Sequence, residues 1–170
     1  IAQRLSELPC AHTIIHVKKE SFDHGGTRSL GAEHSDADVM VFMTQDAVPA
    51  DERLIEKLVH SLDTAQDEAG VVAVAYARQL PAEDCGIIER YTRQFNYPEC
   101  GRRKSKADIE TLGIKTFFCS DVCAAYRRDL FFKLGRFETP VIFNEDMFFA
   151  AHAINAGYQV EYVADAKVIH

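Results

Sequence analysis

The sequence predicts an α/β fold with a mostly parallel central sheet flanked by helices, in a single domain over residues 1–170. Short apolar stretches, suited to strands buried on both faces, alternate with segments whose apolar residues recur at helical spacing. That alternation is typical of an α/β domain. A chain of 170 residues with a hydrophobic fraction of 47% is also large enough for one domain with its own core.

The first part of the chain is expected to hold a helix, a strand and a second helix. Residues 1–8 have apolar residues at helical spacing, and a proline follows them directly. The β-branched segment Thr13–Val17 predicts a strand. Gly25 and Gly26 indicate a turn, after which a short helix is expected over about 27–34.

Two buried strands and a helix come next. Residues 39–44 are continuously apolar, as expected for a strand covered on both faces. Pro49 and Asp51 are expected to open a helix, because the apolar residues that follow them recur on one helical face. The apolar run Gly70–Tyr76 predicts a second buried strand.

The segment 77–111 is polar and irregular, with prolines, a glycine and several arginines. A stretch of this length is either a helix with a mobile loop or an insertion that faces a substrate. The rest of the chain returns to strands and helices, and glycines follow both helices. We expect strands over 114–126, 158–163 and 166–169, and helices over 127–134 and 145–156.

Charge and cysteine content narrow the class of protein. The net charge is −7 and the isoelectric point is near 5.5, which argues against nucleic acid as the main partner. The five cysteines are odd in number and form no CxxC pair, which disfavours a zinc site and a disulfide framework and predicts free thiols in a reducing compartment. No apolar run approaches the ~20 residues that span a bilayer.

Asp46 is the first candidate for chemistry. Ligands of α/β sheets bind beyond the carboxyl ends of strands, and Asp46 lies just past the end of the strand expected over 39–44. Its carboxylate suits a hard divalent cation or a nucleotide contact. The alternative is a turn or capping residue ahead of the helix that Pro49 begins.

Acidic and histidine side chains near the end of the chain are further candidates. The pair Glu145-Asp146 complements the dipole of a helix start, but apolar neighbours also allow it to act as a general base. We expect the helix N-terminus to keep Asp146 ionised at neutral pH. His170 follows a strand-like run and is either a metal ligand or a structural histidine.

Basic and amide side chains could contact an anion. Arg28 follows the expected glycine turn and either reaches a phosphate or base or remains solvated. Arg78 and Gln79 end the second apolar strand, and the same two interpretations apply to them. The aromatic residues within 91–97 form either a sugar-stacking surface or the apolar face of an amphipathic helix.

Seven segments in order carry a family resemblance from about residue 22 to the end of the chain. They read FDHGGTRSLG, DVMVFMTQDAVP, AYARQLP, ERYTRQFNYP, FCSDVCAAYRRDLFFKLGRF, EDMFFAAHAINAGYQVEY and ADAKVIH. Together they resemble the rhamnosyltransferase-like branch of the inverting nucleotide-sugar glycosyltransferases of family 2, which have the GT-A fold. Each segment alone is a weak signal, and their order makes the resemblance specific.

The resemblance implies a donor site. By that likeness, Asp46 with Gln45 corresponds to the motif that binds a metal and the donor diphosphate, although only one acid of the motif remains here. His170 corresponds to a histidine that completes the metal site. Arg28 corresponds to a contact with the donor nucleotide.

The resemblance also implies an acceptor side. Asp146 corresponds to the family's catalytic base, and Glu145, Asp121, Arg78 and Gln79 are assigned to the acceptor side with it. The family usually has Asn at the position of Asp121, so this chain adds negative charge there.

The resemblance further implies that the chain is a fragment. The family begins with two strands that read the nucleotide base, and Ile1 corresponds to a position after them. The usual His-x-His ending is represented only by its first histidine, His170. We therefore expect an N-terminally and C-terminally incomplete catalytic domain.

The implied function is a metal-dependent inverting glycosyltransferase that uses Mg²⁺ or Mn²⁺. We expect it to move a sugar such as rhamnose from a nucleotide-sugar donor to a cell-surface polysaccharide or a lipid-linked acceptor. We expect the enzyme to act in the cytoplasm at the inner face of the membrane. Membrane association is expected through parts of the protein outside this chain. The alternatives are a sugar nucleotidyltransferase and a non-catalytic carbohydrate-binding domain with the same fold.

Overall fold

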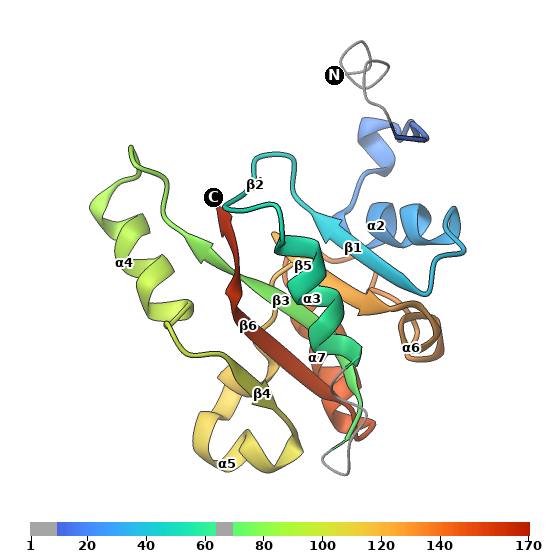
Figure 1. Ribbon diagram of the computed structural model, residues 1–170. Coiled ribbons are helices and arrows are strands. Elements are labelled where there is room, and N and C mark those ends of the chain that lie inside the picture. The colour runs from blue at the N-terminus through green and yellow to red at the C-terminus, as the bar shows by residue number, and fades with distance from the viewer. Residues whose placement is uncertain (1–9, 64–69) are drawn as a thin grey trace.

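A six-stranded sheet forms the centre of the molecule in the computed structural model, which describes residues 10–63 and 70–170 (Figure 1). Five strands are hydrogen-bonded in one path, and a sixth, β4, pairs with β6 at its side. Their order is β1 (Val39–Met43), β5 (Cys123–Arg127), β3 (Val72–Leu80), β6 (Gln159–Ile169) and β2 (Val48–Pro49), with β4 at Arg102–Lys104.

The expectation of a mostly parallel sheet is wrong, because the sheet is mixed. Only β3 and β6 run parallel, and the other four strand pairs are antiparallel. Alternation of strands and helices along a chain fixes the α/β class but not the direction in which each strand enters the sheet. Here β5 enters between β1 and β3 and runs opposite to both of them.

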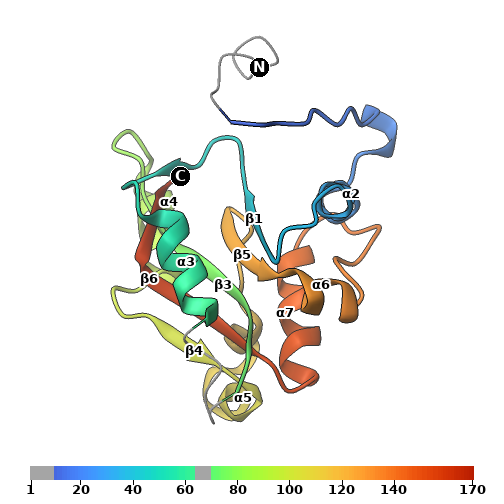
Figure 2. The same ribbon diagram turned by 45° about the vertical axis from the view of Figure 1, so that its right-hand side comes forward.

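Helices cover both faces of the sheet. On one face, α3 (Leu54–Asp63) packs Leu54, Leu58 and Leu62 against the sheet. The other face is covered by α7 (Glu145–Asn155) and α6 (Arg128–Lys133), as the turned view shows (Figure 2). This two-sided burial explains why the strands read as apolar runs rather than as alternating patterns.

Aromatic rings form the centre of the larger core. Tyr126, Phe131 and Phe149 are fully buried, and Phe42 and Phe137 pack against them. The ring centroids of Phe131 and Phe137 are 4.9 Å apart, and the two rings meet edge to face. Such pairs add stability beyond the burial of apolar area alone.

Most of the expected regular elements are present. The strands expected over 39–44 and 70–76 are β1 and β3, and the helices expected over 127–134 and 145–156 are α6 and α7. The helix expected after Pro49 is α3, which begins later because Val48–Pro49 pairs with β6 as strand β2. The helix expected over residues 1–8 lies outside the described residues.

Three expectations near the strands are corrected. Residues 13–17 form no strand, because β-branched composition needs a hydrogen-bonding neighbour and this segment has none in the described part of the chain. The strand expected over 114–126 is the 3₁₀ helix η3 (Gly113–Phe117) followed by β5. The two strands expected over 158–169 are the single strand β6.

Gly25 and Gly26 lie inside helix α2 (His24–Glu33) and do not form a turn before it. Asp23 caps the helix by accepting a hydrogen bond from the backbone N–H of Gly26 at 2.8 Å. A Cβ on Gly25 would lie 2.5 Å from the carbonyl oxygen of Glu138. The glycine therefore lets α2 approach the segment before α7 closely. A short 3₁₀ helix, η1 (Lys19–Ser21), precedes this region.

The irregular middle segment contains the helix α4 (Ile87–Asn96), which stands apart from the other helices (Figure 1). After α4 the chain forms β4, the 3₁₀ helix η2 (Lys106–Asp108), α5 (Ile109–Leu112) and η3. All five cysteines are free. None of the helices in the described ranges has the length and apolar character needed to cross a bilayer.

Candidate active site

Four of the residues singled out from the sequence line one cavity of about 730 Å³. They come from separate parts of the chain: Arg28 from α2, Gln45 and Asp46 from the turn after β1, and His170 from the end of β6. The fold therefore brings together the four residues that the family resemblance assigned to the donor side. The remaining lining residues include Phe22, which lies ahead of α2.

A tight turn places the Asp46 carboxylate at the mouth of the cavity. The backbone N–H of Ala47 donates to the carbonyl of Thr44 at 3.2 Å, and the N–H of Thr44 donates to Val122 on the neighbouring loop at 3.1 Å. The side chain of Asp46 is exposed. The Thr44 side chain, the Asp46 backbone N–H and His170 hold the pKa of Asp46 below its usual range. An ionised, accessible carboxylate is what a hard cation requires.

His170 stands beside Asp46, with Nε2 at 3.5 Å from Asp46 Oδ1. Its other ring nitrogen, Nδ1, lies 3.0 Å from Arg93 Nη2, and Arg93 Nε donates to the His170 carbonyl at 3.2 Å. A guanidinium only donates, so Nδ1 accepts, and a neutral imidazole then carries its proton on Nε2. Coordination of a metal through Nε2 therefore requires Arg93 to release Nδ1, and Glu89 already lies 3.1 Å from the guanidinium.

These residues fit a divalent cation as a partial ligand set. A carboxylate oxygen and an imidazole nitrogen lie side by side at the cavity, and hard cations complete their coordination with phosphate oxygens and water. Within the described part of the chain no cluster of three or more His, Cys, Asp or Glu residues is present that could hold an ion alone. The arrangement is thus suited to a cation that arrives with a phosphorylated ligand.

A second group of side chains forms a carboxylate cluster around Arg28. Arg28 Nη1 donates to Glu145 Oε1, and Arg28 Nε lies 3.6 Å from Asp121 Oδ2. Both acids are buried. Because Arg28 also lines the cavity, it links the cluster to the turn that carries Asp46.

Asp146 is held by backbone groups at the start of α7. Its Oδ2 accepts a hydrogen bond from the N–H of Asp121 at 3.0 Å, and its Oδ1 accepts one from the N–H of Met147 at 2.8 Å. Burial raises the pKa of Asp146, and these two N–H groups oppose that shift. Desolvation is thus the largest single effect on the pKa of Asp146, and the N–H groups at the helix start act against it. The expectation that Asp146 is ionised at neutral pH stays a prediction.

Asp121 is the most strongly perturbed carboxyl of the cluster. Burial, and then the neighbouring Asp146, raise the pKa of Asp121 to about 8. Tyr126 donates its hydroxyl hydrogen bond to Asp121 Oδ1, while Oδ2 has no hydrogen-bond partner. The raised pKa favours the neutral form of Asp121, so this position adds less negative charge than an exposed aspartate would.

Gln79 supports the cluster from β3, and Arg78 does not. Gln79 is buried and its Nε2 donates to the Ser120 hydroxyl at 2.9 Å and to the Tyr97 hydroxyl. This anchors the residue that precedes Asp121. Arg78 instead lies 3.6 Å from Glu99, at the start of the loop after α4.

Sequence reasoning missed the roles of Arg93, Tyr126 and Ser120 in this region. Each acts by holding another residue: Arg93 holds His170, Tyr126 holds Asp121, and Ser120 accepts from Gln79. No local pattern marks these residues, and the partners of Arg93 and Ser120 lie 77 and 41 residues away in the chain. Phe95, expected to pack inward from α4, is exposed.

Comparisons with known proteins identify the family of the chain. The sequence model of the family described as Glycosyl transferase family 2 matches residues 1–135. The chain is 45% identical over 159 residues to the O-antigen chain rhamnosyltransferase RfbN of Salmonella typhimurium, covering 93% of this chain and 49% of that protein. It is 41% identical over 160 residues to the O-antigen chain rhamnosyltransferase WbaN of Salmonella anatum, covering 94% and 49%. The chain thus spans about half the length of the curated relatives it matches.

Solved structures share the fold. The mannosyltransferase PcManGT from Pyrobaculum calidifontis, in complex with GDP-Man and Mn²⁺, matches with a TM-score of 0.60 and 16% identity over 90% of this chain and 37% of that chain. S. aureus TarS 1-349 matches with a TM-score of 0.60 and 13% identity over 85% and 39%. The predicted α/β fold of the GT-A type is confirmed.

Proposed function

This chain belongs to glycosyltransferase family 2, and from that premise we propose that it is the catalytic part of a metal-dependent inverting glycosyltransferase. The observation that carries the proposal is the link through Arg28 between two groups of side chains. On one side Asp46 and His170 lie next to each other at the cavity, and on the other Asp146 lies among buried acids.

The donor of the proposed reaction is a nucleotide sugar, with dTDP-rhamnose as the first candidate. The names of the two curated relatives support rhamnose. Asp46 and His170 would hold a divalent ion, Mg²⁺ or Mn²⁺, with Gln45 beside them as a neutral contact. When bound, the ion supplies Lewis-acid stabilisation of the departing diphosphate. The Mn²⁺ in the structure of PcManGT supports a divalent metal of this kind.

Asp146 is the proposed general base. An acceptor hydroxyl oxygen attacks the anomeric carbon from the face opposite the diphosphate, the bond from that carbon to the diphosphate oxygen breaks, and Asp146 takes the hydroxyl proton. Burial raises the pKa of Asp146 and therefore makes its carboxylate a stronger base. The two backbone N–H groups fix its direction, so the carboxylate needs no reorganisation during the reaction.

Arg28 is proposed to position the acids and to place positive charge at the cavity. Its contact with Glu145 offsets part of the repulsion between that acid and Asp146. The remaining proposed partners are a cell-surface polysaccharide or a lipid-linked saccharide as acceptor. The proposed place of work is the cytoplasm at the inner face of the membrane.

Isothermal titration of the full chain with dTDP, UDP and GDP, each with Mn²⁺ and with EDTA, tests the donor side. We expect dTDP to bind in the presence of Mn²⁺ and this binding to be lost in EDTA. A folded protein that binds no nucleotide would contradict the transferase and favour a carbohydrate-binding domain. Release of pyrophosphate from a nucleoside triphosphate would favour a sugar nucleotidyltransferase.

A further inference from the structure

A second cavity, of about 250 Å³, lies between α4, β4 and the segment that contains η3. Its charged lining residues are all cations: Arg102, Lys104 and Lys115. No acidic residue lines it, although the chain as a whole has a net charge of −7. Most of the remaining lining is aromatic. A pocket with this composition suits an anionic group that is attached to an apolar or ring-shaped one.

Lys104 supplies the buried charge of this pocket. Its ammonium donates to the Tyr76 hydroxyl at 3.2 Å and to the backbone carbonyls of Lys115 and Phe118. In the described residues no carboxylate lies within ion-pair distance of it. Three oxygens already accept from this ammonium and Asp108 acts on it from a distance, but burial still makes its charge costly. An anion in the pocket would offset that cost through its charge.

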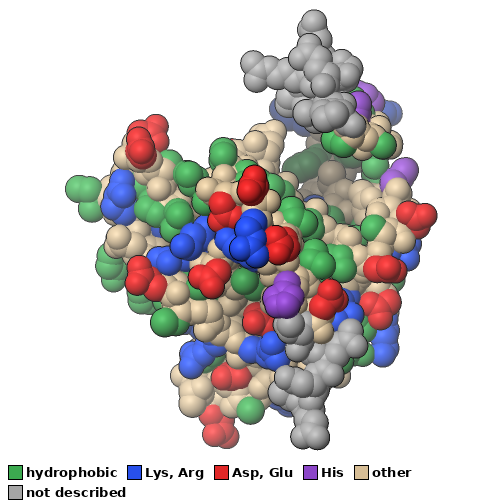
Figure 3. Space-filling view, viewed as in Figure 1, with side chains coloured by type: hydrophobic (Ala, Val, Ile, Leu, Met, Phe, Trp, Pro, Cys, Tyr) green, Lys and Arg blue, Asp and Glu red, His purple; other side chains and the backbone are tan. Residues whose placement is uncertain are grey.

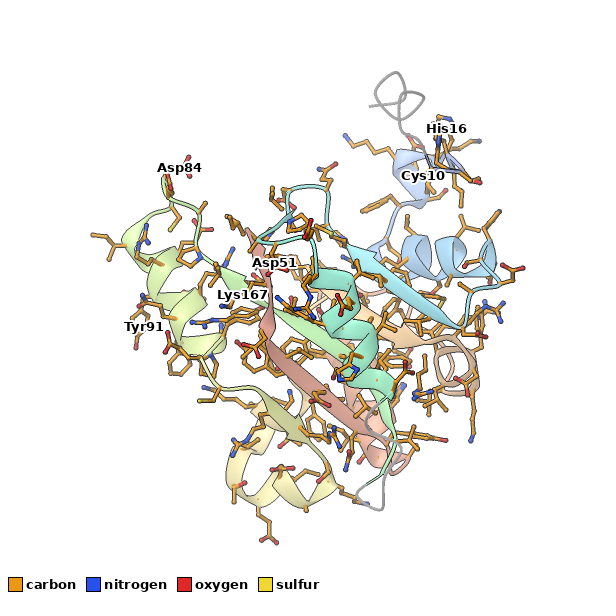
Figure 4. The ribbon with its side chains drawn as sticks, viewed as in Figure 1. Cys10, His16, Asp51, Asp84, Tyr91 and Lys167 are labelled. Atoms are coloured by element: carbon orange, nitrogen blue, oxygen red, sulfur yellow. The ribbon has the colours of Figure 1, made fainter. Side chains whose placement is uncertain are left out.

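An exposed apolar surface adjoins the pocket. On α4, Ile87 is 89% exposed, Ile88 84%, Tyr91 66% and Phe95 56%. Phe95 also lines the pocket, so the two features are continuous. Hydrophobic side chains gather on the outer flank over α4 in the space-filling view, and Tyr91 points away from the sheet in the stick view (Figures 3 and 4). Exposed apolar patches of this kind mark binding surfaces.

A cation sits at the junction of the pocket and the apolar surface. Lys115 Nζ lies 3.6 Å from the centroid of the Phe95 ring, and the Tyr91 and Phe95 rings are stacked with centroids 6.1 Å apart. A ligand that crossed this junction would meet positive charge first and apolar side chains next. That order matches a phosphate that carries a long apolar chain.

A residue that lines the pocket is close in sequence to the residue that binds Asp146. Phe118 lines the pocket, and three residues later the backbone N–H of Asp121 donates to Asp146 Oδ2 at 3.0 Å. Three residues of chain span at most about 10 Å. A saccharide attached to a phosphate in the pocket would thus be able to bring a hydroxyl to Asp146.

We propose that the pocket lined by Arg102, Lys104 and Lys115, together with the apolar face of α4, binds the phosphate and the apolar chain of a lipid-linked acceptor. The link to Asp146 rests on the proposed glycosyltransferase function. Binding of a lipid phosphate at the pocket does not, because it can be measured without any transfer reaction. By this proposal, helix α4 of this chain recognises the lipid part of the acceptor.

Isothermal titration of the full chain in EDTA with farnesyl diphosphate tests the proposal. Inorganic pyrophosphate serves as the head group alone and farnesol as the chain alone. We expect farnesyl diphosphate to bind at least tenfold more tightly than pyrophosphate. Lys115→Ala and Ile88→Ser should each weaken the binding of farnesyl diphosphate about fivefold, which corresponds to about 1 kcal/mol. For Lys115 this is the size expected of one cation near an anionic lipid group.

Matched controls and further outcomes keep the test decisive. Lys19→Ala and Ile55→Ser change an exposed lysine and an exposed isoleucine elsewhere, and they should bind farnesyl diphosphate as the parent does. Equal binding by the parent, Lys115→Ala and Ile88→Ser would overturn the proposal. So would adsorption to phosphatidylglycerol vesicles without farnesyl diphosphate binding, or a change of oligomeric state in Ile88→Ser. Titration with dTDP and Mn²⁺ reports the donor cavity separately, so the two proposals can fail independently.

Discussion

His170 Nε2 lies 3.5 Å from Asp46 Oδ1, although the two residues are 170 − 46 = 124 positions apart in the chain. The pairing of β2 with β6 causes this contact, because Val48 pairs with Ile169. Asp46 is two residues before Val48, and His170 directly follows Ile169. A two-residue strand with no obvious sequence signal therefore builds the proposed metal site.

Asp46→Ala should remove metal-dependent nucleotide binding. Asp46 is the exposed carboxylate of the donor cavity, so its loss should weaken dTDP binding in Mn²⁺ by roughly tenfold or more. Isothermal titration with Mn²⁺ and with EDTA measures the effect. As a control, Asp51→Ala removes another surface carboxylate, which pairs with Lys57, and it should leave the affinity for dTDP in Mn²⁺ unchanged. Unchanged dTDP affinity in Asp46→Ala would assign the donor site to other residues.

Asp146→Asn should abolish transfer while leaving donor binding intact. The amide keeps the shape of the side chain but cannot take a proton, so turnover should fall by about 10²–10⁴-fold. Transfer from dTDP-rhamnose to a saccharide acceptor and titration with dTDP measure the two properties. Since burial raises the pKa of Asp146, activity of the parent should rise with pH as this carboxyl ionises. Activity retained in Asp146→Asn would exclude it as the base.

Asp121→Asn should stabilise the protein, and the gain should grow with pH. The folded pKa of Asp121 is raised to about 8 from an unfolded value of 3.8, so the folded state holds its proton longer. Its contribution to stability is complete below pH 3.8 and is lost as pH rises toward 8. The neutral amide avoids this loss, and the gain at pH 7 should be on the order of 2 kcal/mol. Urea unfolding of both proteins at pH 5 and pH 8 measures it, and parallel stability curves would contradict it.

Binding of farnesyl diphosphate should weaken as pH rises through 8. Burial lowers the pKa of Lys104 to about 8, so the pocket loses its buried charge above that pH. Lys104→Met keeps the apolar stem and should flatten this dependence. The same shift means that Lys104 costs stability fully below pH 8, and that the cost disappears as pH rises toward 10.5. Titrations of the parent and of Lys104→Met with farnesyl diphosphate at pH 7 and pH 9 test this prediction. Equal pH dependence in the two proteins would mean that a group other than Lys104 causes it.

Gly25→Ala should destabilise the fold, and Gly31→Ala should not. A Cβ at Gly25 would lie 2.5 Å from the backbone oxygen of Glu138, and relieving that clash should cost about 1–3 kcal/mol. Gly31 lies in the same helix with open space around it, so alanine there should stabilise the helix by about 0.5–1 kcal/mol. Thermal unfolding of the two variants compares them. Equal effects would mean that the approach of α2 to Glu138 is not required.

Local patterns in the sequence succeeded where one property decides the structure. The apolar run 39–44 correctly predicted strand β1, although only Met40 of that strand is buried. The helix over 145–156 ends where Gly157 adopts a positive φ of 90°. Local patterns failed where the structure depends on a neighbouring segment of the chain. Residues 13–17 have strand composition but no neighbouring strand in the described part of the chain, and α4 has helical periodicity but leaves its apolar face exposed.

The sequence by itself determined the fold class, the family and the identity of the main candidate residues, because these depend on composition, spacing and the order of motifs. Only the tertiary structure decided how those residues combine. The mixed sheet brings Asp46 to His170, and Arg28 binds Glu145 while still lining the donor cavity. Burial, which no linear pattern measures, then sets the pKa of Asp121 and Asp146. Proton affinity depends on the dielectric surroundings and on charges from distant segments, and folding alone creates both.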